Sequence, residues 1–150
     1  MYKYTGDQEV FKAAENLIDS VIASPLVDHS GILTETCDPT GTCNQDQWMF
    51  KGIFFGHLGY LLADICGLNN LDVASKKQLL QKYSNFVHAN AVAVWDVARA
   101  QDGRVGAWWA APVGSQVQKY SVETLGSGIA AVLCSVRLDQ LLHSLEITTA

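Results

Sequence analysis

Carboxylic acids gather in one turn-rich loop of the sequence, residues 26–44, and at the start of the helix predicted to follow it. Glu35 follows an apolar pair, so its side chain points either into a cleft or to water. Asp46 lies where the helix should begin, and it either favours that helix end or faces a ligand. Asp38 precedes a proline, which is typical of a turn residue.

Two carboxyl groups about 5–10 Å apart, on opposite sides of a glycosidic bond, perform glycoside hydrolysis. The chain has 15 acidic residues, but no two of them are adjacent. Glu35, Asp38 and Asp46 cluster around the first long loop.

Lys51 lies inside the predicted second helix, which is otherwise apolar. A buried lysine is costly unless its charge is paired or its side chain lines a wet cavity. Two interpretations follow: a buried salt bridge to a carboxylate, or a contact that orients a sugar hydroxyl or a carboxylate.

Trp108 and Trp109 lie in a second long loop, residues 101–115, among several glycines. An exposed aromatic ring on a loop can stack on the apolar face of a sugar, whereas a buried ring fills the core beneath the loop. We expect one of the two rings to be buried and the other to line the cleft.

Cys37 and Cys43 are close in a loop rich in turn-forming residues. They form either a disulfide that closes a small loop or two free thiols in a reducing compartment. Cys66 and Cys134 lie in apolar runs, so we expect them to be small buried residues.

Composition excludes several classes of function. The net charge is -5 and the pI is near 5.2, with no basic run, which argues against nucleic-acid binding and against an electrostatic membrane anchor. We expect no transmembrane segment, because no stretch of about 18 uninterrupted apolar residues is present. The four histidines lack metal-ligand spacing, and no nucleotide-binding motif occurs, so we expect neither a metal nor another cofactor.

Apolar residues spaced three and four apart, together with capping residues, predict an all-α chain that forms a single domain over residues 1–150. The predicted helices span residues 7–25, 45–65, 72–100, and from Ser115 or Val122 to Leu145. Predicted core positions include Leu17, Val97, Leu133 and Val136. Long loops at alternate connections place both loops at one end of antiparallel helical hairpins.

Three glycines, Gly52, Gly56 and Gly59, share one face of the second helix. Glycine lowers helix stability by roughly 1 kcal/mol per residue. The stripe therefore predicts that another helix, or a ligand, approaches closely along this face, and the apolar character of the whole helix predicts that both its faces are covered.

The segment 32–60 resembles glycoside hydrolase family 76, the α-1,6-mannanase-like proteins. The resemblance rests on Leu-Thr-Glu-Thr-Cys at residues 33–37, Cys-Asn-Gln-Asp-Gln at 43–47 and Phe-Lys-Gly-Ile-Phe at 50–54. It implies the C-terminal half of an (α/α)₆ toroid. It also implies retaining hydrolysis or transglycosylation of α-1,6-linked mannose.

The paired cysteines of the motif resemble the fungal cell-wall branch of the family. In that branch the implied role is the transfer of glycosylphosphatidylinositol-linked proteins from membrane to wall glycan. The implied location is extracellular, at the cell wall or the outer surface of the plasma membrane.

The family's catalytic groups are two consecutive aspartates in the N-terminal half, and no position of this chain matches them. What the resemblance carries over is a glycan-binding wall formed by Asp46, Lys51 and Glu35, beside the two loop tryptophans. We therefore expect a mannan-binding segment without turnover of its own. Its exposed helix faces would be covered by the missing N-terminal half or by self-association. The alternative is a non-catalytic glycan-binding or helical scaffold protein.

Overall fold

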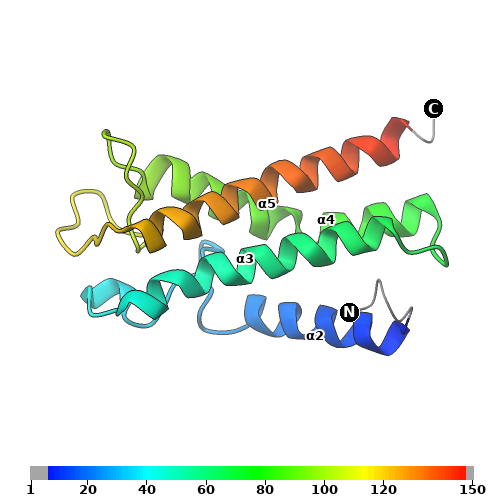
Figure 1. Ribbon diagram of the computed structural model, residues 1–150, viewed down its shortest axis with the longest axis horizontal. Coiled ribbons are helices and arrows are strands. Elements are labelled where there is room, and N and C mark those ends of the chain that lie inside the picture. Colours follow the sequence, from blue (N-terminus) through cyan, green and yellow to red (C-terminus); the bar gives the residue numbers. More distant parts are fainter. Residues whose placement is uncertain (1–6, 148–150) are drawn as a thin grey trace.

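A computed structural model describes residues 7–147, and four long helices account for most of them (Figure 1). These residues contain only isolated β-bridges and no strand, so the predicted all-α class is confirmed. The helices are α2 (Gln8–Ile22), α3 (Gln45–Cys66), α4 (Val73–Val92) and α5 (Val122–Ile147), joined by a 3₁₀ turn, η1 (Asp38–Thr40), and a π-helical turn, η2 (Ala93–Ala98).

Side-chain caps set where three of the helices begin. The carboxylate of Asp7 accepts the backbone N–H of Glu9 at 2.9 Å at the start of α2, and Asp72 caps α4 in the same way. Asn44 and Gln47 exchange reciprocal hydrogen bonds in a capping box that begins α3. The predicted starts agree with these caps because capping residues are readable from sequence alone.

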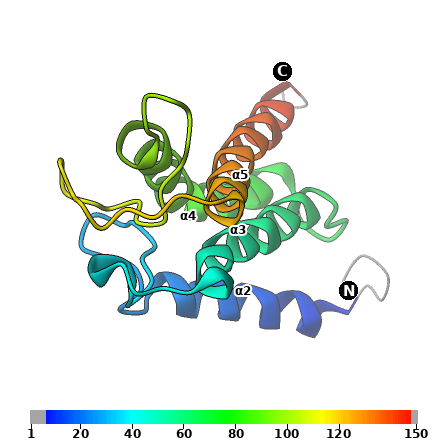
Figure 2. The ribbon, with the colours of Figure 1, turned by 60° about the vertical axis from the view of Figure 1, so that its left-hand side comes forward.

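The helices lie side by side with the long loops at one end (Figure 1). The loops 23–44 and 99–121 share that end, and the short connection 67–72 lies at the other. Helices α3 and α5 therefore run in the same direction, with α2 and α4 antiparallel to them. Turning the molecule shows the two long loops next to each other (Figure 2). The predicted gathering of long loops at one end is confirmed.

Helix α3 packs mainly on α5, through very small residues. A Cβ added to Gly52 would lie 2.6 Å from the Cα of Ser127, so the two backbones are in close contact there. The Ser127 hydroxyl donates to the backbone oxygen of Trp48 at 2.6 Å, which ties the helices together at the same point. The prediction of close helix packing on the glycine stripe is confirmed at Gly52, whereas nothing lies within 4 Å of a Cβ added to Gly56.

Ion pairs and a hydrogen bond connect helix α2 to helix α4. Lys82 of α4 forms ion pairs with Glu15 and Asp19 of α2, at 2.7 and 2.6 Å. The Tyr83 hydroxyl donates to Asp19 at 3.2 Å. These contacts link two helices that are far apart in the sequence.

Several positions that were predicted to be core are exposed. Leu17 of α2, and Leu133 and Val136 of α5, present their side chains outward. On α3, Ile53 and Tyr60 are also exposed, so the expectation that both faces of this helix are covered is wrong for the described residues. These side chains form apolar faces for which the four helices supply no partner, although the apolar periodicity that predicted burial is present.

Val97 was predicted to be buried, and it is exposed for a different reason. The chain leaves α-helical geometry after Val92 and forms the π-helical turn η2. A π-turn bonds residue i to i+5 and holds more residues per turn than an α-helix. The buried position moves accordingly from Val97 to Ala98, and the predicted continuous α-helix to residue 100 is wrong.

Helices α3 and α5 are each long and apolar enough to cross a membrane, judged by length and composition alone. The expected absence of a transmembrane segment rested on a stricter criterion, about 18 uninterrupted apolar residues, and it stays a prediction. Core helices share the same composition, and here the two helices pack against each other along their length.

The glycine stripe yields a matched pair of substitutions on one helix. Gly52→Ala should lower the free energy of unfolding by about 1–3 kcal/mol, because its methyl group would overlap the backbone of Ser127. Gly56→Ala should raise it by about 0.5–1 kcal/mol, because the methyl group meets open space and alanine favours the helix. Urea unfolding followed by circular dichroism measures both, and equal stabilities would contradict the close packing at Gly52.

Candidate functional site

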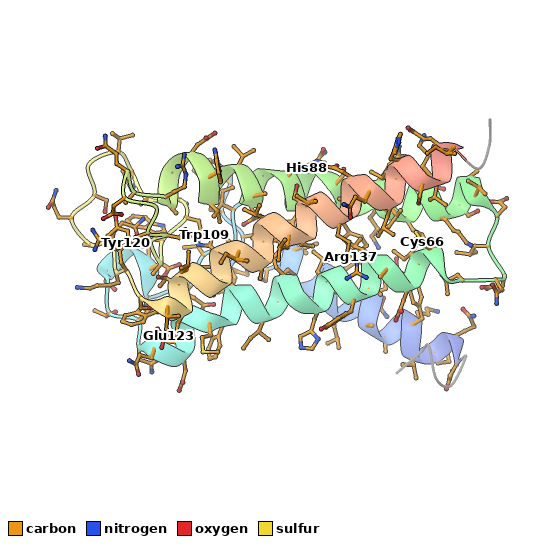
Figure 3. All side chains as sticks on the ribbon, turned by 45° about the horizontal axis from the view of Figure 1, so that its top comes forward. Cys66, His88, Trp109, Tyr120, Glu123 and Arg137 are labelled. Carbon is orange, nitrogen blue, oxygen red and sulfur yellow. A yellow bond between two sulfur atoms is a disulfide. The ribbon has the colours of Figure 1, made fainter. Side chains whose placement is uncertain are left out.

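The loop end of the molecule holds the polar and aromatic residues singled out from the sequence. Trp109, Tyr120 and Glu123 lie at this end, whereas Cys66 lies toward the opposite end (Figure 3). The two loops touch: a Cβ added to Gly41 would lie 3.0 Å from the backbone oxygen of Val117. The site is therefore built from two loops that sit on the starts of α3 and α5.

A buried ion pair lies at the centre of this end. The Lys51 ammonium donates to Oδ2 of Asp38 at 2.5 Å, and the two side chains are each 1% exposed. The same Oδ2 accepts the backbone N–H of Glu35 at 2.9 Å. Asp38 therefore connects a helix, its own turn and the backbone that carries Glu35.

A disulfide between Cys37 and Cys43 closes the loop around Asp38, so of the two interpretations the disulfide is the one that the structure shows. It encloses η1, and the turn ends at Gly41 with φ 64°, a conformation that glycine adopts without strain. The Sγ of Cys43 lies 3.5 Å from Oδ1 of Asp38. The cross-link therefore restricts the short loop that presents Asp38 to Lys51.

The other two cysteines are free. Cys134 is buried, and burial raises the pKa of its thiol to about 12. Cys66 is half-buried, so the expectation of a buried residue holds fully only for Cys134.

Glu35 is half-buried beside this pair. Burial raises the pKa of its carboxyl group, the positive charge of Lys51 opposes that shift, and the negative charge of Asp38 adds to it. Glu35 is therefore an acid whose proton affinity depends on its two charged neighbours.

One of the two tryptophans is buried, as expected, and the other is partly exposed, whereas its predicted place along a cleft stays a prediction. Trp109 is fully buried, with its ring 5.7 Å from that of Phe55 and 5.4 Å from the Lys51 ammonium. It therefore supports the loop from beneath and presents no ring face to a ligand, which revises its predicted place on the binding surface. Trp108 is half-buried, and Gln118 holds its backbone by two hydrogen bonds, of 3.1 and 2.6 Å.

The remaining predicted binding residues take different positions. Asp46 is exposed in the first turn of α3, at the loop end, so it remains a predicted ligand contact. Lys51 is buried, so the salt-bridge interpretation is the one that the structure shows. Any contact of Lys51 with a glycan would require this pair to open.

Sequence reasoning missed two residues that build the site. Asp38 was interpreted as a turn residue, although a lysine in an apolar helix signals that an acidic partner lies nearby. Asn90 is fully buried on α4, where it accepts the backbone N–H of Leu33 at 2.8 Å and donates to the Gly31 oxygen at 2.9 Å. An asparagine within the apolar stripe of α4 was the available signal for this anchor.

Comparison with known proteins gives the family. The model of glycosyl hydrolase family 76 matches residues 1–136. The chain belongs to glycosyl hydrolase family 76. No curated protein matches it.

The family 76 chain is also similar to a solved structure. That structure is an inactive variant, with two aspartates replaced by asparagine, of the family 76 α-1,6-mannanase of Salegentibacter sp. HEL1_6, in complex with α-1,6-mannotriose. The TM-score is 0.67 with 19% sequence identity, and the match covers 91% of this chain. The fold is thus a partial (α/α)₆ toroid. The match covers 36% of the mannanase chain.

Removing the charge of Lys51 tests how strongly this family 76 segment depends on the buried pair. Lys51→Met should lower the free energy of unfolding by about 3–5 kcal/mol, because Asp38 is left as an uncompensated buried charge. Lys77→Met, in the exposed pair with Glu146, should change it by less than about 1 kcal/mol. Chemical denaturation of both variants measures the difference, and similar small losses would show that the Asp38–Lys51 pair is not desolvated.

The pKa of Glu35 predicts the sign of a pH effect. A carboxyl group whose pKa is raised in the folded state binds its proton more tightly there than in the unfolded chain. Its contribution to stability is therefore present at acid pH and is lost as the pH rises from the ordinary value of 4.5 through the raised one.

Glu35→Gln should remove this contribution. The stability of the variant relative to the parent should increase as the pH rises from about 4 to 7. Denaturation midpoints at several pH values give the measurement, and a difference that is constant or falls with pH would contradict the raised pKa.

Proposed function

We propose that this chain is the C-terminal part of an endo-α-1,6-mannosidase-like glycoside hydrolase or transglycosylase that acts on α-1,6-linked mannose in cell-wall biogenesis. The observation that carries the proposal is the family 76 match over residues 1–136. The mannanase with the similar fold is described in complex with α-1,6-mannotriose, which supports a mannose-containing glycan as the ligand.

The chemistry of the loop end supports the same ligand. Sugars are bound by hydrogen bonds to their hydroxyl groups and by aromatic contact with their apolar faces. Glu35, Asp46 and the partly exposed Trp108 offer these groups at one end of the helices. The net charge of -5 suits a neutral glycan better than an anionic one.

We further propose that the chain supplies the binding wall and that the catalytic aspartates lie in the missing N-terminal half of the toroid. The inactive mannanase variant carries two substituted aspartates, which supports a role for aspartates in that enzyme. The N-terminal half would also cover the exposed faces of α3 and α5. Self-association of this chain is the other way to cover them.

The disulfide supports an extracellular location, at the cell wall or the outer surface of the plasma membrane. Disulfides persist in oxidising compartments and are rare in the cytosol. Cys37 and Cys43 form one around Asp38, at the heart of the proposed binding wall.

Binding and turnover of the purified chain test this function together. We expect α-1,6-mannotriose to bind, as detected by titration calorimetry or by NMR shifts of loop residues, without release of reducing ends from α-1,6-mannan. Maltotriose, an α-1,4-linked trisaccharide of glucose, serves as the control ligand and should bind more weakly. Release of reducing ends would contradict the placement of the catalytic groups elsewhere, and equal binding of the two trisaccharides would contradict the specificity.

Substitution locates the binding wall. Glu35→Gln should weaken mannotriose binding by roughly tenfold, the effect of one lost hydrogen bond to a charged group. Glu146→Gln, near the end of α5 and away from the long loops, is the matched control and should leave affinity unchanged. Equal effects of the two substitutions would rule out the loop end as the binding surface.

A further inference from the structure

Asp38 makes a set of contacts that a turn residue does not need. One oxygen, Oδ2, accepts both the Lys51 ammonium at 2.5 Å and the backbone N–H of Glu35 at 2.9 Å. The residue is 3% exposed, so its charge is kept out of water. A turn of this kind can form with its aspartate carboxylate in solvent. The burial of the Asp38 carboxylate therefore indicates a more specific role for this side chain.

The backbone on both sides of Glu35 is fixed by buried polar groups. Upstream, Asn90 holds residues 31 and 33 by hydrogen bonds of 2.9 and 2.8 Å. Downstream, Asp38 holds the N–H of Glu35 itself, and the disulfide between Cys37 and Cys43 restrains Asp38. Glu35 is thus an acidic residue whose backbone is held on both sides, and it is only half-buried.

We propose that Asp38 is a positioning residue for the glycan site: it does not touch the glycan, and it fixes Glu35 in the place from which Glu35 binds a sugar hydroxyl. The inference rests on the proposed function for the role of Glu35, and on geometry alone for the link between Asp38 and Glu35. The direct contact is the hydrogen bond from the Glu35 backbone to the Asp38 carboxylate.

Charge adds a second link between the same residues. The negative charge of Asp38 raises the pKa of Glu35, and the positive charge of Lys51 lowers it. The pair therefore affects both where the Glu35 carboxyl group lies and how readily it loses its proton. Substitution of Asp38 should therefore change the position and the proton affinity of the Glu35 carboxyl group even in the absence of glycan.

Two near-isosteric double variants separate positioning from simple stability. Asp38→Leu/Lys51→Met replaces the ion pair by apolar side chains, a change that often preserves folding. Asp38→Asn/Lys51→Met also removes both charges, but it keeps an oxygen that can accept the Glu35 N–H. The two variants therefore differ chiefly in that one hydrogen bond.

The expected result is a difference in glycan affinity between these variants. At pH 7.5, the leucine variant should bind α-1,6-mannotriose roughly tenfold more weakly than the asparagine variant. Adding Glu35→Gln to the leucine variant should cause little further loss, because Asp38 acts through Glu35. Equal affinities of the leucine and asparagine variants, or losses that simply add, would overturn the proposal.

A measurement without glycan keeps this test independent of the proposed function. NMR of the free chains should show a Glu35 amide signal and a Glu35 carboxyl titration that differ between the leucine and asparagine variants, because these variants lack the same two charges and only the asparagine oxygen can accept the Glu35 N–H. Asp102→Leu is the control, since Asp102 also accepts a backbone N–H and a cation, both from Arg104, but in an exposed loop. If the parent chain binds no mannotriose, the proposed function fails. A Glu35 amide signal and a Glu35 titration that are the same in the leucine and asparagine variants overturn the positioning role in either case.

Discussion

The buried contact between Lys51 and Asp38 is the constraint on which the loop end depends. An ammonium group inside an apolar helix is costly unless it is paired or reaches water, and here the paired charge comes from a loop. The helix therefore fixes the loop, and the loop fixes the residues beside it. Stability and site geometry depend on the same atoms, because Oδ2 of Asp38 bonds both the helix and the backbone of Glu35.

The architecture brings this contact to the end where both long loops meet. Helices α3 and α5 run in the same direction and pack closely, at Gly52 most of all. Both helices begin at the loop end, so the segments that precede them share one surface. A toroid of such hairpins collects its long loops at one face, while its helices supply a common core. The exposed apolar faces of α3 and α5 are those expected of a chain that forms part of such a toroid.

Much of this fold was predictable because it depends on local sequence patterns. Caps such as Asp7 and Asn44 mark helix starts, and apolar spacing marks helix length. The apolar faces at Leu133 and Val136 were correctly recognised as apolar but wrongly expected to be covered. Periodicity reports that a face needs a partner, and it does not report whether the partner belongs to the same chain.

The site was less predictable, because its key contacts join distant segments. Lys51 was recognised as a buried charge that needs a partner, but the choice of Asp38 depends on how a disulfide-closed loop folds back on α3. Asn90 was missed for the same reason, since its partners lie in a loop far away in the sequence. Trp109 shows the limit for aromatic residues: a ring on a loop can face solvent or the core, and only packing against Phe55 decides.

The π-helical turn after Val92 also sets the direction in which the chain leaves the helix. An α-helix advances about 100° per residue, so one extra residue in a turn rotates the exit direction by about that amount. After η2, the chain turns back on itself: the Gly106 N–H bonds the oxygen of Ala98 at 2.9 Å, and the Arg99–Val105 bridge follows. The rotation within η2 therefore sets the direction of the loop that places Trp109 against Lys51, about ten residues further along the chain.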